Sequence, residues 1–105
     1  MDFAATRPPT ARELLLLRLL VPGERYGREL RIEYVRATGE PLPLGSLYVT
    51  LARMEDKGLI GGRMGEDTHE RGGNRRKYYR LTAEGMRHLD KWCLATSGLR
   101  MLAFR

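Results

Sequence analysis

Cysteine and histidine are scarce in this 105-residue chain, and their scarcity excludes several kinds of site. The single cysteine, Cys93, can form no internal disulfide and no multi-cysteine metal site, and it fits a reducing cytosol. The two histidines, His69 and His88, have no metal-ligand spacing, and His88 lies about 140° around a helix from Cys93, too far for a nucleophile–base pair. We therefore expect no enzyme, no metal and no cofactor.

Long hydrophobic stretches are also lacking. The longest apolar run, residues 14–21, is interrupted by Arg18 and is far too short to span a bilayer. The N-terminus has neither the basic start nor the apolar centre of a signal peptide. We expect the chain to stay in the cytoplasm and away from membranes.

Positive charge is in excess, with a formal net charge of +6 and a pI near 10.0. The 42% hydrophobic share permits one domain with a small core, which many chains of this size complete by dimerising. Nucleic acid is the commonest anionic partner of a small basic domain. A ribosomal, RNA-binding or membrane-surface protein would have the same totals, so charge alone leaves the partner open.

The first predicted helix follows residues 1–9, which show no periodicity and are expected to form a flexible arm. Thr10 and Glu13 make a capping box, and the leucine-rich segment after them ends before Pro22. Leucines cover nearly the whole circumference of this helix. It is therefore either a central core helix or a helix partly covered by a second subunit.

A second helix is predicted from about residue 26 or 27 to Thr38, with Gly39 ending it. Its inner stripe consists of Leu30, Tyr34 and Ala37. Its three arginines point elsewhere, and a solvated face is their default interpretation: Arg28, Arg31 and Arg36. The proline-rich segment 40–43 is predicted to be extended and to lead into a third helix.

The third helix, residues 44–57, has two different faces between the signals of Pro43 and Gly58. One narrow arc is apolar and should be buried: Leu44, Leu47, Leu51 and Met54. The opposite face carries small or polar groups and one long cation: Ser46, Val49, Thr50 and Arg53. Such a face can enter a groove of a nucleic acid, although most amphipathic helices only cover a core.

A hairpin is predicted next, with strands at residues 59–64 and 75–81 and a polar loop between them. Alternation places Tyr79 and Leu81 toward the core and Tyr78 on the other side. Five cations gather within ten residues: Arg71, Arg75, Arg76, Lys77 and Arg80. They form either a solvated loop or a surface for phosphates and the minor groove.

The last predicted helix begins at Thr82 and continues to at least Ala95, with two apolar stripes. One stripe contains Met86, Leu89, Cys93 and Phe104, and the other contains Trp92 and Leu99. Because a terminal helix in a monomer needs only one buried face, the second stripe suggests contact with a two-fold related subunit. The predicted fold is mainly α with a two-stranded β wing, a winged helix-turn-helix at residues 10–81 followed by a dimerisation helix at 82–105.

Two stretches resemble the PadR-type transcriptional regulators. LGSLYVTLARMEDKGLI, residues 44–60, is similar to the family pattern G-[ST]-L-Y followed by L-x-R-[LM]-E-x-x-G-L-[IV]. RGGNRRKYYRLTAEG, residues 71–85, is similar to its G-G-x-x-R-K-Y-Y-x-[LI]-T-x-x-G. Tyr26 to Leu30 fits the Y-G-x-E-L segment, so that the resemblance covers roughly residues 10–95.

The resemblance implies a winged-helix, DNA-binding repressor that forms a homodimer through its C-terminal helix and often responds to a small molecule. By motif position, the recognition helix carries Ser46, Tyr48, Val49, Thr50 and Arg53, and the wing carries Arg75, Arg76 and Lys77. The connection at residues 41–43 is unusually rich in proline. The chain also ends soon after one C-terminal helix, as in the short members of the family.

We expect this dimer to bind a pseudo-palindromic operator in double-stranded DNA, with Arg53 or Ser46 reading base edges and Arg28 and Arg31 holding phosphates. Trp92 is interpreted as an aromatic side chain of the dimer interface, or alternatively as a ring that stacks on a flat apolar or aromatic effector. Two rival functions remain. An RNA- or protein-binding module would leave aromatic residues exposed on the sheet, and an oligomerising protein would keep the fold without binding DNA.

Overall fold

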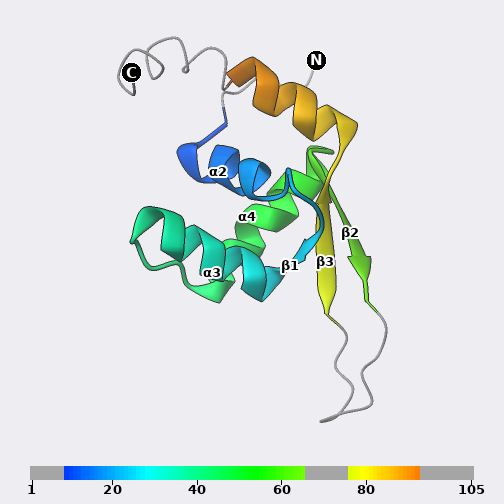
Figure 1. The fold of residues 1–105 in the computed structure, drawn as a ribbon. Coiled ribbons are helices and arrows are strands. Elements are labelled where there is room, and N and C mark those ends of the chain that lie inside the picture. The colour runs from blue at the N-terminus through cyan, green and yellow to red at the C-terminus, as the bar shows by residue number, and fades with distance from the viewer. Residues whose placement is uncertain (1–8, 66–75, 93–105) are drawn as a thin grey trace, which may run out of the picture.

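Three helices, a small sheet and a further helix make up the fold of this computed structural model, which describes residues 9–65 and 76–92 (Figure 1). The elements in chain order are α2 (Ala11–Leu19), β1 (Arg25–Tyr26), α3 (Gly27–Thr38), α4 (Leu44–Asp56), β2 (Ile60–Met64) and β3 (Lys77–Leu81). The helix that follows, here the C-terminal helix, is described over residues 83–92. No helix among the described residues is long and apolar enough to cross a membrane.

The sheet has three strands where the sequence predicted two. Strands β2 and β3 form the predicted antiparallel hairpin, with Ile60 opposite Leu81 and Met64 opposite Lys77. The third strand, β1, pairs with the other edge of β3, which gives the order β1-β3-β2. A two-residue strand has no period that a sequence can reveal, and β1 lies in the connection between the first two predicted helices.

Two predicted helix signals are confirmed. The hydroxyl of Thr10 accepts a hydrogen bond from the backbone N–H of Glu13, whose carboxylate accepts one from the N–H of Thr10. Gly39 has a φ of 72°, the left-handed conformation that a glycine adopts most readily at a helix end. Glu13 is also buried and pairs with Lys57 at 3.2 Å, which joins the start of α2 to the end of α4.

The core forms around the predicted apolar stripe of α4. Leu47, Leu51 and Met54 are completely buried, and Leu44 at the start of the helix is half-buried. They contact a cluster supplied by the other helices and the sheet, which includes Leu16, Leu17, Leu30, Tyr34 and Tyr79. The core therefore holds one face of α4 and leaves the opposite face toward solvent.

One predicted core position is corrected by the structure and two are confirmed. Ala37 is exposed, because α3 turns that part of its last turn away from the cluster. Tyr79 is 3% exposed and Leu81 is half-buried and packs against the core cluster, so both face the core as predicted. In α2, the leucines nearest the start of the helix, Leu14 and Leu15, are half-buried.

The C-terminal helix lies across the end of the domain that α2 occupies (Figure 1). The hydroxyl of Thr82 accepts a hydrogen bond from the N–H of Gly85 at 2.9 Å, which confirms the predicted cap. Gly85 packs directly on the carbonyl of Leu59, leaving no room for a Cβ, and Leu89 is buried. Of the arm predicted at residues 1–9, residues 1–8 lie outside the described residues, as do Cys93, Leu99 and Phe104, so the domain boundaries stay predictions.

Truncating the buried stripe should destabilise the fold strongly. Leu51→Ala should lower the free energy of unfolding by about 2–5 kcal/mol, the usual cost of removing a buried leucine side chain. Val49→Ala on the exposed face should stay within about 0.5 kcal/mol of the parent. Urea denaturation followed by circular dichroism, at one fixed protein concentration, measures both. Equal losses for the two variants would contradict the assigned faces of α4.

Candidate nucleic-acid interface

The exposed face of α4 is narrow and free of acidic residues in its first turn. Ser46 and Arg53 are exposed, as are Tyr48 and Val49 at 42% and 52%. Pro43 precedes the helix without a side-chain cap, and Gly45 has open space around it. Apart from the ring of Tyr48, the first turns of α4 therefore present only small side chains to a binding partner.

Thr50 does not belong to this face, which corrects the prediction. It is only 8% exposed, and its hydroxyl donates a hydrogen bond to the carbonyl oxygen of Ser46 at 3.0 Å. At about 100° per residue, Thr50 lies only about 60° from Leu47 around the helix. It therefore borders the buried stripe, and its hydroxyl is satisfied within the helix.

Tyr48 joins α4 to α3. A Cβ added at Gly27 would lie 2.5 Å from the hydroxyl oxygen of Tyr48 and 2.7 Å from its Cε1. The ring therefore packs over the start of α3, where only a glycine leaves room for it. Sequence reasoning missed this role of Gly27, although the Tyr26-Gly27 pair of the family pattern could have indicated it.

Arg28 and Arg31 both project from α3 into solvent. The Nε of Arg31 donates a hydrogen bond to the carbonyl oxygen of Leu42 at 2.7 Å. This bond holds the proline-rich connection in place directly before α4. Arg31 thus has a structural contact, whereas Arg28 forms no ion pair or side-chain hydrogen bond within the described residues and is available to an anion.

A stack of tyrosine and arginine side chains covers the outer face of the sheet at the base of the wing. The guanidinium of Arg76 lies 4.6 Å from the ring centre of Tyr26, and Tyr26 meets Tyr78 edge-on at 5.7 Å. Arg63 lies 4.9 Å from the ring centre of Tyr78 and makes two 2.7 Å hydrogen bonds to Glu24. The pKa of Glu24 is lowered by this arginine. The stack fixes β1 to the hairpin.

Lys77 links the wing to α4 through an ion pair. Its Nζ lies 3.0 Å from Oε1 of Glu55, near the C-terminal end of α4, and 5.5 Å from the ring centre of Tyr79. A Cβ at Gly62 would meet both side chains of this pair. Lys77, predicted as a DNA contact, therefore has an internal partner that the sequence did not indicate.

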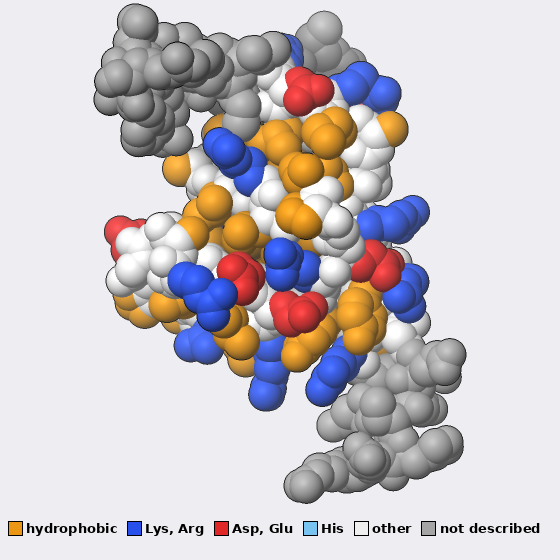
Figure 2. Space-filling view, viewed as in Figure 1, with side chains coloured by type: hydrophobic (Ala, Val, Ile, Leu, Met, Phe, Trp, Pro, Cys, Tyr) orange, Lys and Arg blue, Asp and Glu red, His pale blue; other side chains and the backbone are white. Residues whose placement is uncertain are grey.

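Some charged side chains of the described residues form ion pairs, and others project unpaired into solvent. Glu13, Glu24 and Glu55 are paired with basic side chains, whereas Arg28 and Arg53 form no ion pair within the described residues. Figure 2 shows Lys and Arg side chains projecting along the lower edge of the view, between the start of α3 and the hairpin. Arg71 and Arg75 lie outside the described residues. Arg28 and Arg53, beside the exposed face of α4, are thus among the cations that remain available to an anion.

The tyrosines of the hairpin do not form a platform for unpaired bases. Tyr79 is 3% exposed, and Tyr78 is half-buried beneath Arg63 and beside Tyr26. Recognition of single-stranded RNA by stacking needs exposed rings. This arrangement weighs against the RNA-binding alternative.

Trp92 is half-buried near the end of the described part of the C-terminal helix. The Nζ of Lys91 lies 5.3 Å from its ring centre, and the ring of His88 lies 6.3 Å away. Burial lowers the pKa of His88, and the positive charge of Lys57 acts in the same direction. The predicted role of Trp92 in an interface or effector site stays a prediction.

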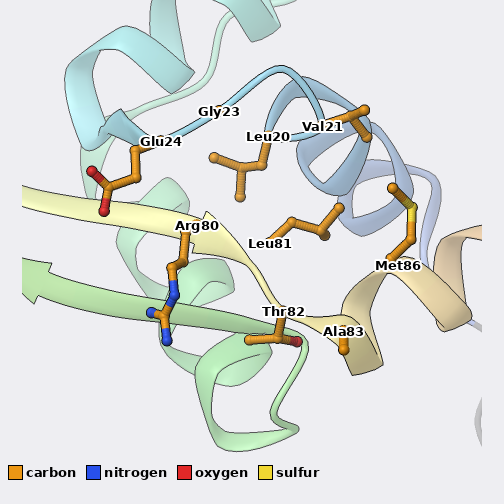
Figure 3. A pocket seen from close by; sticks show the side chains of 9 residues that line it. All are labelled: Leu20, Val21, Gly23, Glu24, Arg80, Leu81, Thr82, Ala83 and Met86. Atoms are coloured by element: carbon orange, nitrogen blue, oxygen red, sulfur yellow. The ribbon is translucent and has the colours of Figure 1, made fainter.

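A groove with an apolar wall opens between the end of α2, β3 and the C-terminal helix (Figure 3). Leu20, Leu81, Val21 and Met86 form the wall, and Glu24 and Arg80 lie at the end away from Met86. Val21 and Met86 are 48% and 38% exposed. The groove thus leaves apolar surface open beside the C-terminal helix.

The sequence model of the transcriptional regulator PadR-like family matches residues 16–91. The chain belongs to this family. An uncharacterized protein of Lysinibacillus sphaericus is 32% identical over 79 residues, which are 73% of this chain and 70% of that protein. The protein is thus a PadR-like transcriptional regulator, and the matched span includes α3, α4 and the hairpin.

Solved structures share the fold of this PadR-like chain. A PadR family transcription regulator of Clostridium difficile is 32% identical, with a TM-score of 0.69 over 86% of this chain and 91% of that one. Bacillus subtilis PadR in complex with operator DNA is 24% identical, with a TM-score of 0.70. The comparison covers 82% of this chain and 47% of the Bacillus subtilis protein, and it shows a common fold.

The buried Tyr79 should make stability depend on alkaline pH. Burial raises the pKa of Tyr79 to about 12, with the carboxylate of Glu55 adding to the effect. A tyrosine in the unfolded chain titrates near 10, so between about pH 10 and 12 the unfolded state loses its proton first and the free energy of unfolding falls. Urea titrations at pH 9 and 11.5 should show a smaller fall for Tyr79→Phe. An equal fall in the free energy of unfolding for parent and variant would contradict the raised pKa of Tyr79 as the cause.

Proposed function

We propose that this PadR-like regulator binds double-stranded DNA as a homodimer, with α4 in the major groove and the wing against the adjacent backbone or minor groove. The observation that carries the proposal is the exposed face of α4, which is thin, free of acidic residues in its first turn and flanked by Arg28 and Arg53. An α-helix with small exposed side chains can approach base edges closely.

The proposed DNA contacts divide into two groups. Ser46, Val49 and Arg53 face the bases or the edge of the groove, with Tyr48 beside them against α3. Phosphates are held by the cations around them: Arg28, Arg31, Arg75, Arg76 and Lys77. Of these, Lys77 must share its charge with Glu55, so we expect its contribution to be small. Bacillus subtilis PadR, which shares the fold, has been solved with operator DNA.

A homodimer through the C-terminal helix would bring two copies of α4 to a pseudo-palindromic operator, about 34–36 Å apart on one side of the duplex. The support is the open apolar groove beside that helix and the half-buried leucines of α2, Leu14, Leu15 and Leu19. Repression of nearby genes is the proposed output, since a dimer on an operator can block access to a promoter. As an extension of the proposal, a small apolar or aromatic effector would bind at the same interface and stack on the ring of Trp92.

The proposed site of action is the cytoplasm, because a bacterial regulator must share a compartment with the DNA that it binds. We propose no catalytic activity, since the family is one of transcriptional regulators. The second candidate, an oligomerising protein that keeps the fold without binding DNA, would use the same apolar surfaces. DNA binding distinguishes the two.

Selection of duplexes from a random pool, followed by titration across a salt series, tests the proposal. The parent should enrich a two-fold related sequence, and the logarithm of its affinity should fall linearly with the logarithm of salt concentration. Arg75→Ala with Arg76→Ala should weaken binding to all duplexes alike. Because the dimer loses two arginines from each subunit, the slope should fall by about 3.6, about 0.9 for each of four phosphate contacts. Lys91→Ala, on the C-terminal helix, is the control with an unchanged slope.

Two results would contradict the proposal. If no duplex is enriched, or if single strands compete as well as duplexes, α4 does not read double-stranded DNA. An unchanged affinity in the double variant would remove the wing from the interface while leaving α4 in place.

The dimer interface is tested by adding a charge to the groove. Met86→Glu places a carboxylate on an exposed side chain, so the monomer should stay folded while association becomes costly. Sedimentation should give twice the 12.0 kDa chain mass for the parent and a shift toward the monomer for the variant. Ile32→Glu, 50% exposed on α3, is the matched control and should remain dimeric. A monomeric parent would contradict the proposed assembly.

A further inference from the structure

We propose that Val49 reads the C5-methyl group of a thymine, so that each operator half-site is recognised by apolar contact with a T·A pair and not by a hydrogen-bonded base reader. This inference rests on the proposed DNA binding through α4. In this proposal, Val49 is the side chain of α4 that distinguishes one base from another.

Val49 projects into solvent from a part of the helix surface where most neighbouring side chains are small. The positions three and four residues away are its neighbours on the surface, and here they are Gly45, Ser46, Ala52 and Arg53. Three of these four are small, and nothing lies within 4 Å of a Cβ placed at Gly45. The two methyl groups of Val49, 52% exposed, are therefore the main apolar group at the middle of this face, with the ring of Tyr48, 42% exposed, on the flank against α3.

Hydrogen-bonding groups in the first turns of α4 offer little discrimination. The hydroxyl of Thr50 is used within the helix, and that of Tyr48 lies against Gly27 on the flank facing α3. Ser46 remains, but a serine hydroxyl both donates and accepts and can pair with any base. The side chains in the first turns of α4, which would lie deepest in the major groove, can therefore distinguish bases mainly by apolar contact.

Arg53 is displaced from this region along the helix axis. It follows Ser46 by seven residues, about 10.5 Å at 1.5 Å per residue. Recognition helices contact base edges with their N-terminal residues, which places the second half of α4 toward the rim of the groove. Arg53 is thus positioned for phosphates or a flanking base, and Arg53→Ala should weaken binding to all duplexes to a similar extent.

Thymine is the one base that matches such a surface. In the major groove it presents the C5-methyl group beside its O4 acceptor, whereas the other three bases present only hydrogen-bonding groups there. A valine next to this methyl group removes both apolar surfaces from water. Burial of one methyl-sized group corresponds to about fourfold in affinity.

Replacing thymine by deoxyuridine removes this methyl group and leaves every hydrogen-bonding group unchanged. The probe is the duplex recovered by selection from the random pool, with deoxyuridine placed at one pair of symmetry-related thymines at a time. For the parent, substitution at the pair of thymines that Val49 contacts should lower the affinity by about fourfold for each methyl group removed. For Val49→Ala, the thymine and deoxyuridine duplexes should bind equally.

Ile32→Ala is the matched control, because Ile32 is also an exposed β-branched residue, at 50%, but lies on α3. It should preserve the difference between thymine and deoxyuridine. Circular dichroism of Val49→Ala should show the helical content of the parent.

Equal binding of the two duplexes by the parent, at every thymine, would overturn the inference, as would a selected half-site that contains no thymine. A difference that survives Val49→Ala would also overturn it by assigning the methyl contact to another residue. These outcomes all require that the parent binds a selected duplex. Failure to bind any duplex would instead contradict the proposed function.

Discussion

Burial of one face of α4 is the constraint on which the rest of the molecule depends. Leu47, Leu51 and Met54 are withdrawn completely from water, and they contact side chains from the other helices and the sheet. Because this face is held firmly, the opposite face is presented in a single orientation. Its small side chains then matter, since a bulky residue there would hold the backbone away from a partner.

The wing is attached to this rigid unit by polar and aromatic contacts. Lys77 pairs with Glu55 of α4, and Arg63 pairs with Glu24 while it covers Tyr78. These contacts use cations that the net charge of +6 would suggest are free for a ligand. The basic character of the protein is thereby concentrated in fewer side chains, among them Arg28 and Arg53, which lie beside the exposed face of α4.

A PadR-like regulator built in this way would separate affinity from specificity. Arginines on α3 and the wing can attract phosphates of any sequence. Beyond its glycine and alanine, the exposed face of α4 carries Ser46, Tyr48, Val49, Arg53 and Asp56, so discrimination between bases depends on few side chains. Small exposed residues permit the close approach that such a sparse contact requires.

The sequence by itself determined the elements with local signals. The Thr10–Glu13 capping box, the glycine end of α3 at Gly39, the buried stripe of α4 and the hairpin all follow from spacing along the chain, because their physical causes act between neighbouring residues. The family was likewise evident from two motifs. Only the tertiary structure decided the third strand, the burial of Thr50 and the pairing of Lys77 with Glu55, residues that are 22 positions apart. These depend on how helices and strands pack, which no local period encodes.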